Sequence, residues 1–508
     1  MTGKPQGVAS SAIAGMRWNY LGTLASTLSS VVISTVLARI LGPGPFGQAI
    51  VAITVYALVN LFVDGGFSQA LIQHKEISDD HIRRTFTCQV LIGVASTVLV
   101  YLAAPLIAAL FHVAGVVPVI RAISLLMTVQ SAGLVSSALL RREMRFRVLQ
   151  YATLVSYLVS YLGVGIPLAL AGKGVWSLVA AYLCQATLNS AFLYAAARHP
   201  ITPVFGLPPR SIAVFGGIVM ANSLVYWGHT NLDNLAASYR GPTALGLYGR
   251  ACNLAYQPCN ALVASLQSVL LSSAAKVSDK TELVGRIALA SMVLVLGILG
   301  PAYAAFIAAP STVIIGLYGH KWVAAIPLMV PIALAMPLLG SIRVLNPIIC
   351  GVGRPTLEFW PQAVSCVLAA AAYFTAVHYS VLAVAWALLG VTTVRFLLTG
   401  ATIFAALRVS WWRATLAAAG RLLFSTLFAL CTLVFDRVLL AAGLTPSLRL
   451  AALFLFCTLL LAGSVWYCSA LVFGREAVNL LIHYSLHLPR TYARRLQAYA
   501  GDPLVLPL

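Results

Sequence analysis

Apolar residues fill the chain in long runs that short polar connections separate. A membrane-spanning helix needs about 20 mostly apolar residues, and an apolar run of about 18 or more residues indicates one. The pattern predicts an all-α polytopic membrane protein with about fourteen transmembrane helices. Segment 246–275 fits the pattern least well, because Gly, Asn, Gln and Pro258 interrupt it. The predicted spans are 17–41, 45–63, 87–110, 119–140, 149–171, 175–197, 213–236, 246–275, 287–309, 323–345, 359–377, 381–404, 421–443 and 448–473.

Composition excludes the soluble classes. Of 508 residues, 60% are hydrophobic and 9% are charged, and the mean hydropathy is +0.93. That balance rules out a soluble, disordered, fibrous or secreted disulfide-rich protein. The nine cysteines form no C-x-x-C pair, so neither a zinc site nor a disulfide framework is indicated. The net charge of +20 does not indicate nucleic-acid binding, because hydrocarbon-spanning helices cannot form a continuous basic face.

The basic residues indicate the orientation in the membrane. With a cytoplasmic N-terminus, 23 of the 32 Lys and Arg residues fall on the inner side and 8 on the outer side. Cytoplasmic loops carry the excess of positive charge, so both termini are expected to be cytoplasmic. The tail, 474–508, has an amphipathic stretch followed by Arg490, Arg494 and Arg495, and it is expected to lie along the anionic inner leaflet.

A repeat divides the predicted helices. Residues 42–47 read Gly-Pro-Gly-Pro-Phe-Gly and residues 241–246 read Gly-Pro-Thr-Ala-Leu-Gly, and both fit G-P-x-x-[FL]-G at an offset of 199. Each motif lies between the first and second span of a group of six. The sequence thus predicts two six-helix lobes related by a pseudo-two-fold axis along the membrane normal, plus two extra helices. The predicted regions are 1–200 (N-lobe), 201–405 (C-lobe), 406–473 (extra pair) and 474–508 (tail).

Several motifs in residues 15–405 resemble the polysaccharide transporter family, within the multidrug/oligosaccharidyl-lipid/polysaccharide flippase superfamily. The matching segments are Gly15–Trp18, Leu37–Pro43, Phe46–Gly47, Asp64–Ile72, Leu140–Phe146, Gly172–Val179, Asn231–Asn234, Gly246–Arg250, Tyr318–Trp322 and Gly351–Pro355. After Asn234 the chain departs from the family pattern, with Leu-Ala-Ala-Ser-Tyr-Arg in place of aliphatic residues and Gly-Arg.

The resemblance implies a multi-pass protein of the bacterial inner membrane. Such a protein flips polyprenyl-diphosphate-linked oligosaccharide to the outer leaflet for lipopolysaccharide or exopolysaccharide assembly. The partners it implies are the lipid-linked oligosaccharide, membrane lipids and the polysaccharide polymerase or export machinery. No enzymatic function is expected, because the short predicted outer loops leave no room for an active site.

A central cationic cavity that binds a diphosphate is one interpretation of the arginines in and near the spans. Guanidinium stays charged and its paired N–H groups fit phosphate oxygens. The alternative is that a residue at the end of a span extends to the headgroups. Arg395 lies about 14 residues into its run, so it cannot extend easily. The candidate substrate-binding residues are Arg17, Asn19, Arg121, Arg250 and Arg395.

His229 and Asp233 are four residues apart and share one helical face. The pair is a candidate coupling site for H⁺ or Na⁺, and no other cofactor and no resident metal is indicated. Its alternative is a hydrogen-bonded helix contact with Asn231, Asn234 or Arg250.

Asp64, Gly65 and Gly66 end the second span. They form either a hinge or a plain helix terminator, because Gly permits unusual backbone conformations.

The sequence therefore predicts a flippase that works by alternating access. A cation-coupled exporter of small molecules from the same superfamily is the first alternative. It would favour acidic cavity residues, whereas basic residues outnumber acidic ones within these spans. An integral-membrane glycosyltransferase or polysaccharide polymerase is the second, and it would need catalytic residues on sizeable outer loops.

Overall fold

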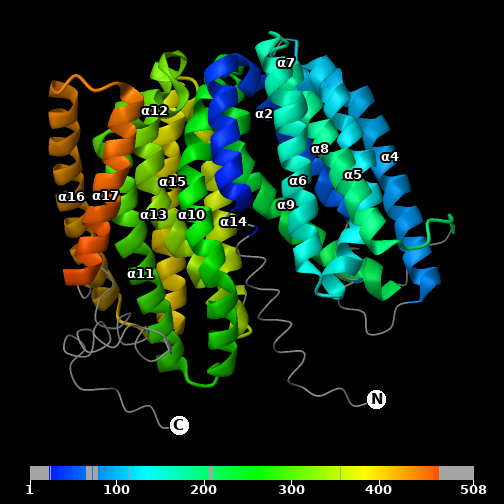
Figure 1. Ribbon diagram of the computed structural model, residues 1–508. Helices are drawn as coiled ribbons and strands as arrows, with labels where there is room; N and C mark the ends of the chain where they lie inside the picture. Colours follow the sequence, from blue (N-terminus) through cyan, green and yellow to red (C-terminus); the bar gives the residue numbers. More distant parts are fainter. Residues whose placement is uncertain are drawn as a thin grey trace. The chain divides into compact units, whose positions relative to one another are not determined.

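Helices make up every element of the part of the chain that the computed structural model describes, which is residues 22–467 apart from 23–24, 65–70, 72–77, 114, 205–209 and 355. The first is Ala25–Leu41. The labelled helices (Figure 1) are α2 (Pro43–Asp64), α4 (Asp79–Leu110), α5 (Val117–Arg142), α6 (Phe146–Ser160), η1 (Tyr161–Gly165), α7 (Ile166–Leu170), α8 (Val175–Ala197), α9 (Arg210–Ser238), α10 (Pro242–Lys276), α11 (Thr281–Ala308), α12 (Pro310–Tyr318), η2 (His320–Ala325), α13 (Ile326–Gly351), α14 (Thr356–Ala376), α15 (Val381–Ala406), α16 (Trp411–Ala441) and α17 (Pro446–Tyr467).

The polytopic, all-helical prediction is confirmed. Each of the predicted spans overlaps a helix, and eleven helices within the described ranges are long and apolar enough to cross a membrane. The sequence missed α12, a nine-residue helix between two predicted spans, because it is too short to stand out as an apolar run. The predicted tail, 474–508, lies outside the described residues.

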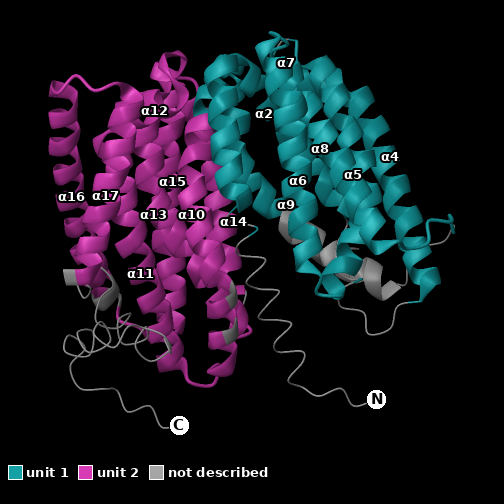
Figure 2. Cartoon of the chain, viewed as in Figure 1, with its two compact units in different colours: residues 1–249 teal, residues 250–508 magenta. Residues whose placement is uncertain are grey.

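The chain forms two compact units, residues 1–249 (unit 1) and 250–508 (unit 2) (Figure 2). Their boundary falls inside α10, whose first eight residues belong to unit 1. In unit 1, α5 packs against α2, α4 and α8. In unit 2, α11 packs against α13 and α16, and α15 packs against α13 and α14. The sequence places the boundary between the lobes at residue 200, and that division stays a prediction.

The two Gly-Pro motifs contact each other within unit 1, where α2 and α10 begin. A Cβ atom on Gly47 would lie 1.7 Å from the carbonyl oxygen of Pro242, and a Cβ atom on Gly246 would lie 1.9 Å from that of Pro43. Pro242 is equivalent to Pro43, and Gly246 to Gly47, at the repeat offset of 199. The two contacts therefore involve the same pair of equivalent positions. Both glycines are therefore required by the close approach of two backbones, which is how small residues let membrane helices pack.

Glycines and a polar cluster hold the last two helices to the rest of unit 2. A Cβ atom on Gly300 of α11 would lie 2.2 Å from Ser425 Oγ of α16, and Gly316 of α12 packs similarly against Leu450 of α17.

The polar cluster joins three of these helices. The Asp436 carboxylate accepts hydrogen bonds from Thr312 Oγ1 (2.6 Å) and from the Arg449 guanidinium (3.1 Å). Asp436 is buried, so this ion pair ties α16 and α17 to α12.

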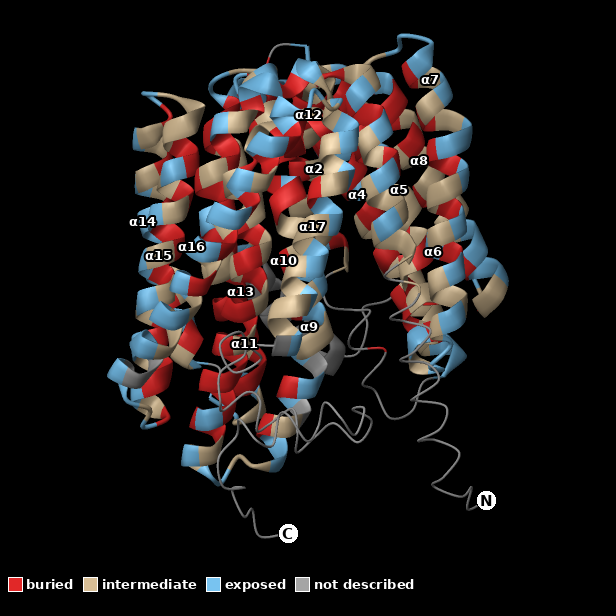
Figure 3. Ribbon diagram, turned by 60° about the vertical axis from the view of Figure 1, so that its left-hand side comes forward, coloured by how far each residue is buried: buried red, intermediate tan, exposed pale blue. Residues whose placement is uncertain are grey.

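Exposed and buried faces differ between helices (Figure 3). Much of α11 is buried, whereas α16 exposes a row of leucines that includes Leu416, Leu423 and Leu427. In unit 1, α4 exposes Leu99, Leu102 and Leu106, each at least 66% accessible. Aliphatic faces of this kind suit contact with lipid tails.

The close contacts of Gly47 and Gly246 predict a loss of stability when either glycine gains a side chain. Gly47→Ala and Gly246→Ala should each lower the free energy of unfolding by about 1–3 kcal/mol or more, because neither backbone can move away cheaply. Gly44→Ala is the matched control, since its Cβ atom would lie 3.7 Å from Thr243 Oγ1, an ordinary contact, and should stay within about 1 kcal/mol of wild type. Thermal unfolding of the purified protein in detergent measures all three, and equal destabilisation by Gly44→Ala would contradict the account.

Candidate functional site

Four of the predicted site residues, Arg17, Asn19, Gly65 and Gly66, lie outside the described residues. Asp64 is the last residue of α2. The hinge interpretation therefore stays a prediction.

Arg121, in the second turn of α5, lies along the neighbouring α4. Its Nε donates a hydrogen bond to the Tyr101 carbonyl oxygen at 3.4 Å, and its guanidinium carbon lies 4.8 Å from the centre of the Tyr101 ring. Tyr101 is 46% exposed, so the guanidinium lies at the outer surface of unit 1. This position favours the headgroup interpretation for Arg121.

Arg250 is buried at 7% exposure within unit 2. Its guanidinium carbon lies 5.1 Å from the centre of the Tyr318 ring, which belongs to α12 and is itself buried. A cation over an aromatic face is attracted by the ring quadrupole. In this conformation, Arg250 connects α10 to α12.

Arg395 forms a buried ion pair, an arrangement that sequence reasoning missed. The Arg395 Nη2 atom lies 3.3 Å from Glu358 Oε1, and Asn346 Nδ2 donates a hydrogen bond to the other carboxylate oxygen. Arg395 is 5% exposed and Glu358 is 7% exposed. The cluster joins α13, α14 and α15 within unit 2, and it favours a structural role for Arg395. Glu358 lies one residue before the predicted span 359–377, which is why the apolar pattern did not include it.

Asp233 of α9 is 3% exposed and has its hydrogen bonds satisfied within unit 1. Its Oδ2 accepts from the Tyr248 hydroxyl at 2.9 Å, and its Oδ1 accepts from the Asn234 backbone N–H at 2.8 Å. Tyr248 is fully buried on α10. In this conformation Asp233 makes a hydrogen-bonded helix contact, with Tyr248 as a partner that the sequence did not indicate.

Helix α10 carries polar side chains on its exposed face. Asn253, Asn260 and Gln267 are exposed, and Gln257 is half-buried on the same side. With 35 residues α10 is long enough to cross a membrane, yet it is not among the eleven apolar helices, because these amides lower its hydropathy. The spacing of three, four and seven residues is the sequence signal that could have identified this face.

Pro258 lies inside α10, in the middle of its polar part. The Tyr303 hydroxyl of α11 inserts beside it, donating to the Ala255 carbonyl oxygen and accepting from the Cys259 N–H at 3.1 Å. A buried hydroxyl thus satisfies backbone groups that the interrupted helix leaves open. This insertion fixes the orientation of the polar face.

Arg343 of α13 lies next to this face. It donates a hydrogen bond to Asn260 Oδ1, and its guanidinium carbon lies 5.8 Å from the centre of the Tyr256 ring. Arg343 is half-buried, and within the described parts of the chain it forms no ion pair. Among the described residues, no carboxylate therefore neutralises its positive charge.

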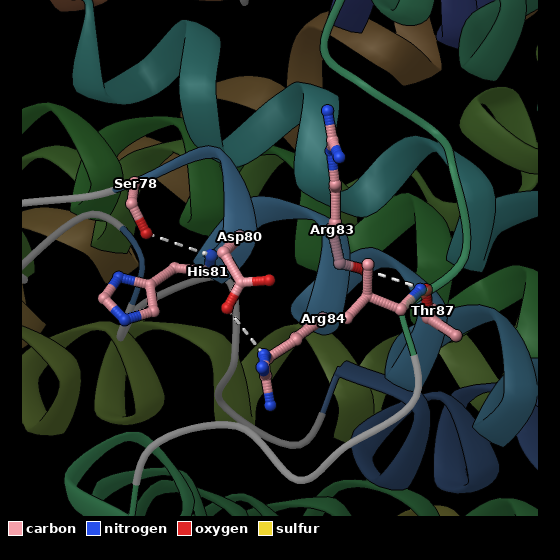
Figure 4. A network of polar contacts seen from close by, with 7 residues as sticks. Ser78, Asp80, His81, Arg83, Arg84 and Thr87 are labelled. Carbon is pink, nitrogen blue, oxygen red and sulfur yellow. Dashed lines mark hydrogen bonds and ion pairs between the residues drawn. The ribbon is translucent and has the colours of Figure 1, made fainter.

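The beginning of α4 is a polar region outside the spans (Figure 4). Ser78 caps the helix by accepting a hydrogen bond from the His81 N–H at 3.3 Å, and Arg84 Nε lies 2.7 Å from Asp80 Oδ2. The Thr87 hydroxyl donates to the Arg83 carbonyl oxygen at 2.8 Å. Acidic residues in a first turn and a side-chain cap stabilise the start of a helix, so this charge cluster is explained by helix capping.

His199 is buried just after α8, near the same region. Its Nδ1 donates to the Pro200 carbonyl oxygen at 3.2 Å, which leaves Nε2 to accept from the Ser136 hydroxyl at 3.0 Å. Phe86 and Tyr194 pack against its ring edge-on. Burial lowers the pKa of His199, and the hydrogen bond to Pro200 opposes that shift in part.

No group of three or more His, Cys, Asp or Glu side chains in the described residues is placed to hold a metal ion.

Eleven helices in the described residues that are long and apolar enough to cross a membrane, with buried ion pairs between helices, define a polytopic helical membrane protein. The solved structure of the lipid II flippase MurJ in an inward closed conformation has a TM-score of 0.70, at 13% identity, over 89% of this chain and 99% of that chain.

The family follows from the sequence comparison. The model of the family described as polysaccharide biosynthesis protein matches residues 36–327, and the chain belongs to this family. The match confirms the resemblance drawn from the motifs.

Two curated relatives are similar over a large part of their length. The lipopolysaccharide biosynthesis protein WzxC of Escherichia coli is 27% identical over 326 residues, which is 62% of this chain and 65% of the relative. The succinoglycan biosynthesis transport protein ExoT of Rhizobium meliloti is 26% identical over 351 residues, 68% of this chain and 70% of the relative.

The Arg395 ion pair predicts a coupled effect of two substitutions. Arg395→Met leaves the Glu358 carboxylate buried without its counter-charge and should cost about 3–5 kcal/mol of stability. Adding Glu358→Gln removes that charge, keeps an oxygen for Asn346, and should restore most of the loss. Thermal unfolding in detergent measures both variants. A stable Arg395→Met variant that no longer transports would instead assign Arg395 to the substrate.

The His199 environment predicts a pH dependence. A lowered pKa in the folded protein means that the unfolded chain binds a proton at a pH where the folded chain does not. The free energy of unfolding therefore contains its full His199 contribution above the pKa of the unfolded chain, about 6.5. That contribution is lost as the pH falls below this value. The unfolding midpoint should drop between pH 7 and pH 5, and His199→Gln should flatten that drop, whereas His320→Gln, at an exposed site, should not. If the unfolding midpoint of His199→Gln fell between pH 7 and pH 5 as steeply as that of wild type, His199 would not be the source of the pH dependence.

Proposed function

We propose that the protein is a flippase that moves polyprenyl-diphosphate-linked oligosaccharide from the inner to the outer leaflet of a bacterial inner membrane. The observation that carries the proposal is the combination of a match to the polysaccharide biosynthesis family with a fold like that of the lipid II flippase MurJ. The names of WzxC and ExoT support a role in lipopolysaccharide or exopolysaccharide assembly. On this proposal the protein is a transporter and not an enzyme.

The mechanism we propose is alternating access between two repeats of six helices, with two extra helices, fourteen in all. The reciprocal contacts Gly47–Pro242 and Gly246–Pro43 support a local two-fold relation, because exchanging residue i with i+199 leaves the contact unchanged. Parallel repeats of this kind are related by an axis along the membrane normal, and alternating access is the rocking of one repeat against the other. The distribution of basic residues supports a cytoplasmic placement of both termini.

Within this proposal, Arg17, Asn19 and Arg250 are the residues expected to meet the diphosphate in some stage of transport. A ligand drives a conformational change only if it binds the two states with different affinity. Arg250 satisfies that requirement if it leaves the Tyr318 ring for phosphate in one state. Arg121 and Arg395 are better explained by the surface contact and the ion pair described above.

The driving force proposed for transport is an H⁺ or Na⁺ gradient acting through His229 and Asp233. The polymerase or export machinery of the same polysaccharide is the proposed protein partner, since it would receive the flipped oligosaccharide.

A liposome assay tests the function. The purified protein, reconstituted with a fluorescent polyprenyl-diphosphate oligosaccharide, should expose that lipid to an enzyme added outside, whereas protein-free liposomes should not. Transport of a soluble cationic drug with no flipping would favour the exporter of the same superfamily. Release of free polyprenyl diphosphate during the assay would favour a glycosyltransferase or polymerase.

The coupling proposal makes a separate prediction. Asp233→Asn should retain flipping but lose its dependence on an imposed H⁺ or Na⁺ gradient, because an amide cannot take up a proton or neutralise a cation. Flipping rates with and without each gradient provide the measurement. Unchanged gradient dependence in Asp233→Asn would leave the Asp233–Tyr248 hydrogen bond as a purely structural contact.

A further inference from the structure

The exposed face of α10 differs from the exposed faces of the other long helices. On α4 that face consists of Leu99, Leu102 and Leu106, and on α16 it consists mainly of leucine and valine. On α10, between residues 253 and 267, the exposed positions include Asn253, Asn260 and Gln267, with Ala261 and Ala264 between them, and large apolar side chains (Val269 and Leu271) are exposed only beyond that stretch.

The polar positions occupy the middle of the helix. From Asn253 to Gln267 a helix rises about 21 Å, at 1.5 Å per residue, within a hydrocarbon core about 30 Å thick. Amide groups exposed to hydrocarbon lose hydrogen bonds to water without replacement, which is strongly unfavourable. A face with several such groups must therefore be in contact with water or with a polar ligand.

Arg343 adds a cation to the same face. Its guanidinium contacts Asn260 and Tyr256, and it forms no ion pair within the described residues. By contrast, the intramembrane Arg395 has a carboxylate partner. Arg343 lies on a helix long and apolar enough to cross a membrane, and an arginine there with no carboxylate partner among the described residues indicates a site for an anion, since guanidinium fits phosphate oxygens in particular.

We infer that Asn253, Tyr256, Gln257, Asn260, Gln267 and Arg343 form a binding face for the headgroup of a glycosyl diphosphate lipid. This inference rests on the proposed function and assigns the part of the substrate that each group meets. Arg343 binds the diphosphate. The amides of Asn253, Gln257 and Gln267 bind sugar hydroxyls, since an amide both donates and accepts hydrogen bonds. The Tyr256 ring offers an apolar surface to a sugar ring.

Binding measurements on the full chain in nanodiscs separate the two parts of the face. The probes are a short-chain polyprenyl diphosphate and the same lipid carrying N-acetylglucosamine. Arg343→Gln should raise the Kd for both probes by about ten-fold or more, because it removes a charge-assisted hydrogen bond. Arg343→Lys should recover only part of that loss, because lysine lacks the paired donors.

The amide positions should affect one probe only. The double variant Asn253→Leu with Gln257→Leu should raise the Kd for the glycosylated probe about ten-fold and leave the Kd for the sugar-free probe unchanged. Arg437→Gln, which removes an exposed arginine on α16 of the same unit, is the matched control and should change neither value. Equal losses for both probes in the double variant would overturn the assignment of the amides to the sugar.

The accessibility of position 253 to a water-soluble reagent gives a second measurement. It does not depend on how well the variants above bind the probes. Asn253→Cys should react with a water-soluble maleimide well above the background of the parent chain, and the glycosylated probe should protect it. Absence of reaction would overturn the inference, since it would place this face against lipid. If wild type flips the oligosaccharide but these variants behave as wild type, the binding face is wrong and the proposed function stands. If wild type neither binds nor flips any glycosyl diphosphate, the proposed function itself fails.

Discussion

A polar group inside a lipid bilayer must find either a partner or water, and most of this structure follows from that constraint. Three buried acidic residues within the described helices meet it with partners from another helix. Glu358 has Arg395 and Asn346, Asp436 has Arg449 and Thr312, and Asp233 has the Tyr248 hydroxyl. Each such cluster connects two or three helices, so these scarce polar residues specify which helices are neighbours. The amide face of α10 is different, because its side chains are exposed.

Close packing is the second constraint. Lipid tails are as apolar as leucine side chains, so helices in a membrane associate mainly through shape and hydrogen bonds. The glycines follow this rule: Gly47 and Gly246 allow two backbones to touch, and Gly300 and Gly316 receive side chains of α16 and α17. The last two helices are thus an integral part of unit 2. A role for them in lipid contact is compatible with the leucine-rich outer face of α16.

The sequence predicts the helices far better than it predicts the partners of polar residues. Apolar runs located the long helices but not the nine-residue α12, and the offset of 199 paired Gly47 with Gly246 as equivalent positions. Arg395 was expected not to extend easily to the headgroups, but its partner Glu358, 37 residues away on another helix, was not foreseen. Such pairings depend on tertiary packing, which no local pattern reports. The polar face of α10 was overlooked for a related reason, since the amides were counted as interruptions of a span and not as one side of a helix.

The central claim is that the polar face of α10 is in contact with water at the depth of the bilayer centre. Spin labels at positions 253, 260 and 267 of α10, and at 99, 102 and 106 of α4 as the lipid-facing reference, can be compared by paramagnetic resonance in nanodiscs. The account predicts that a water-soluble nickel chelate relaxes the α10 labels and that oxygen, which concentrates in lipid, relaxes the α4 labels. Equal oxygen relaxation of both sets, with no effect of the nickel chelate on α10, would contradict it.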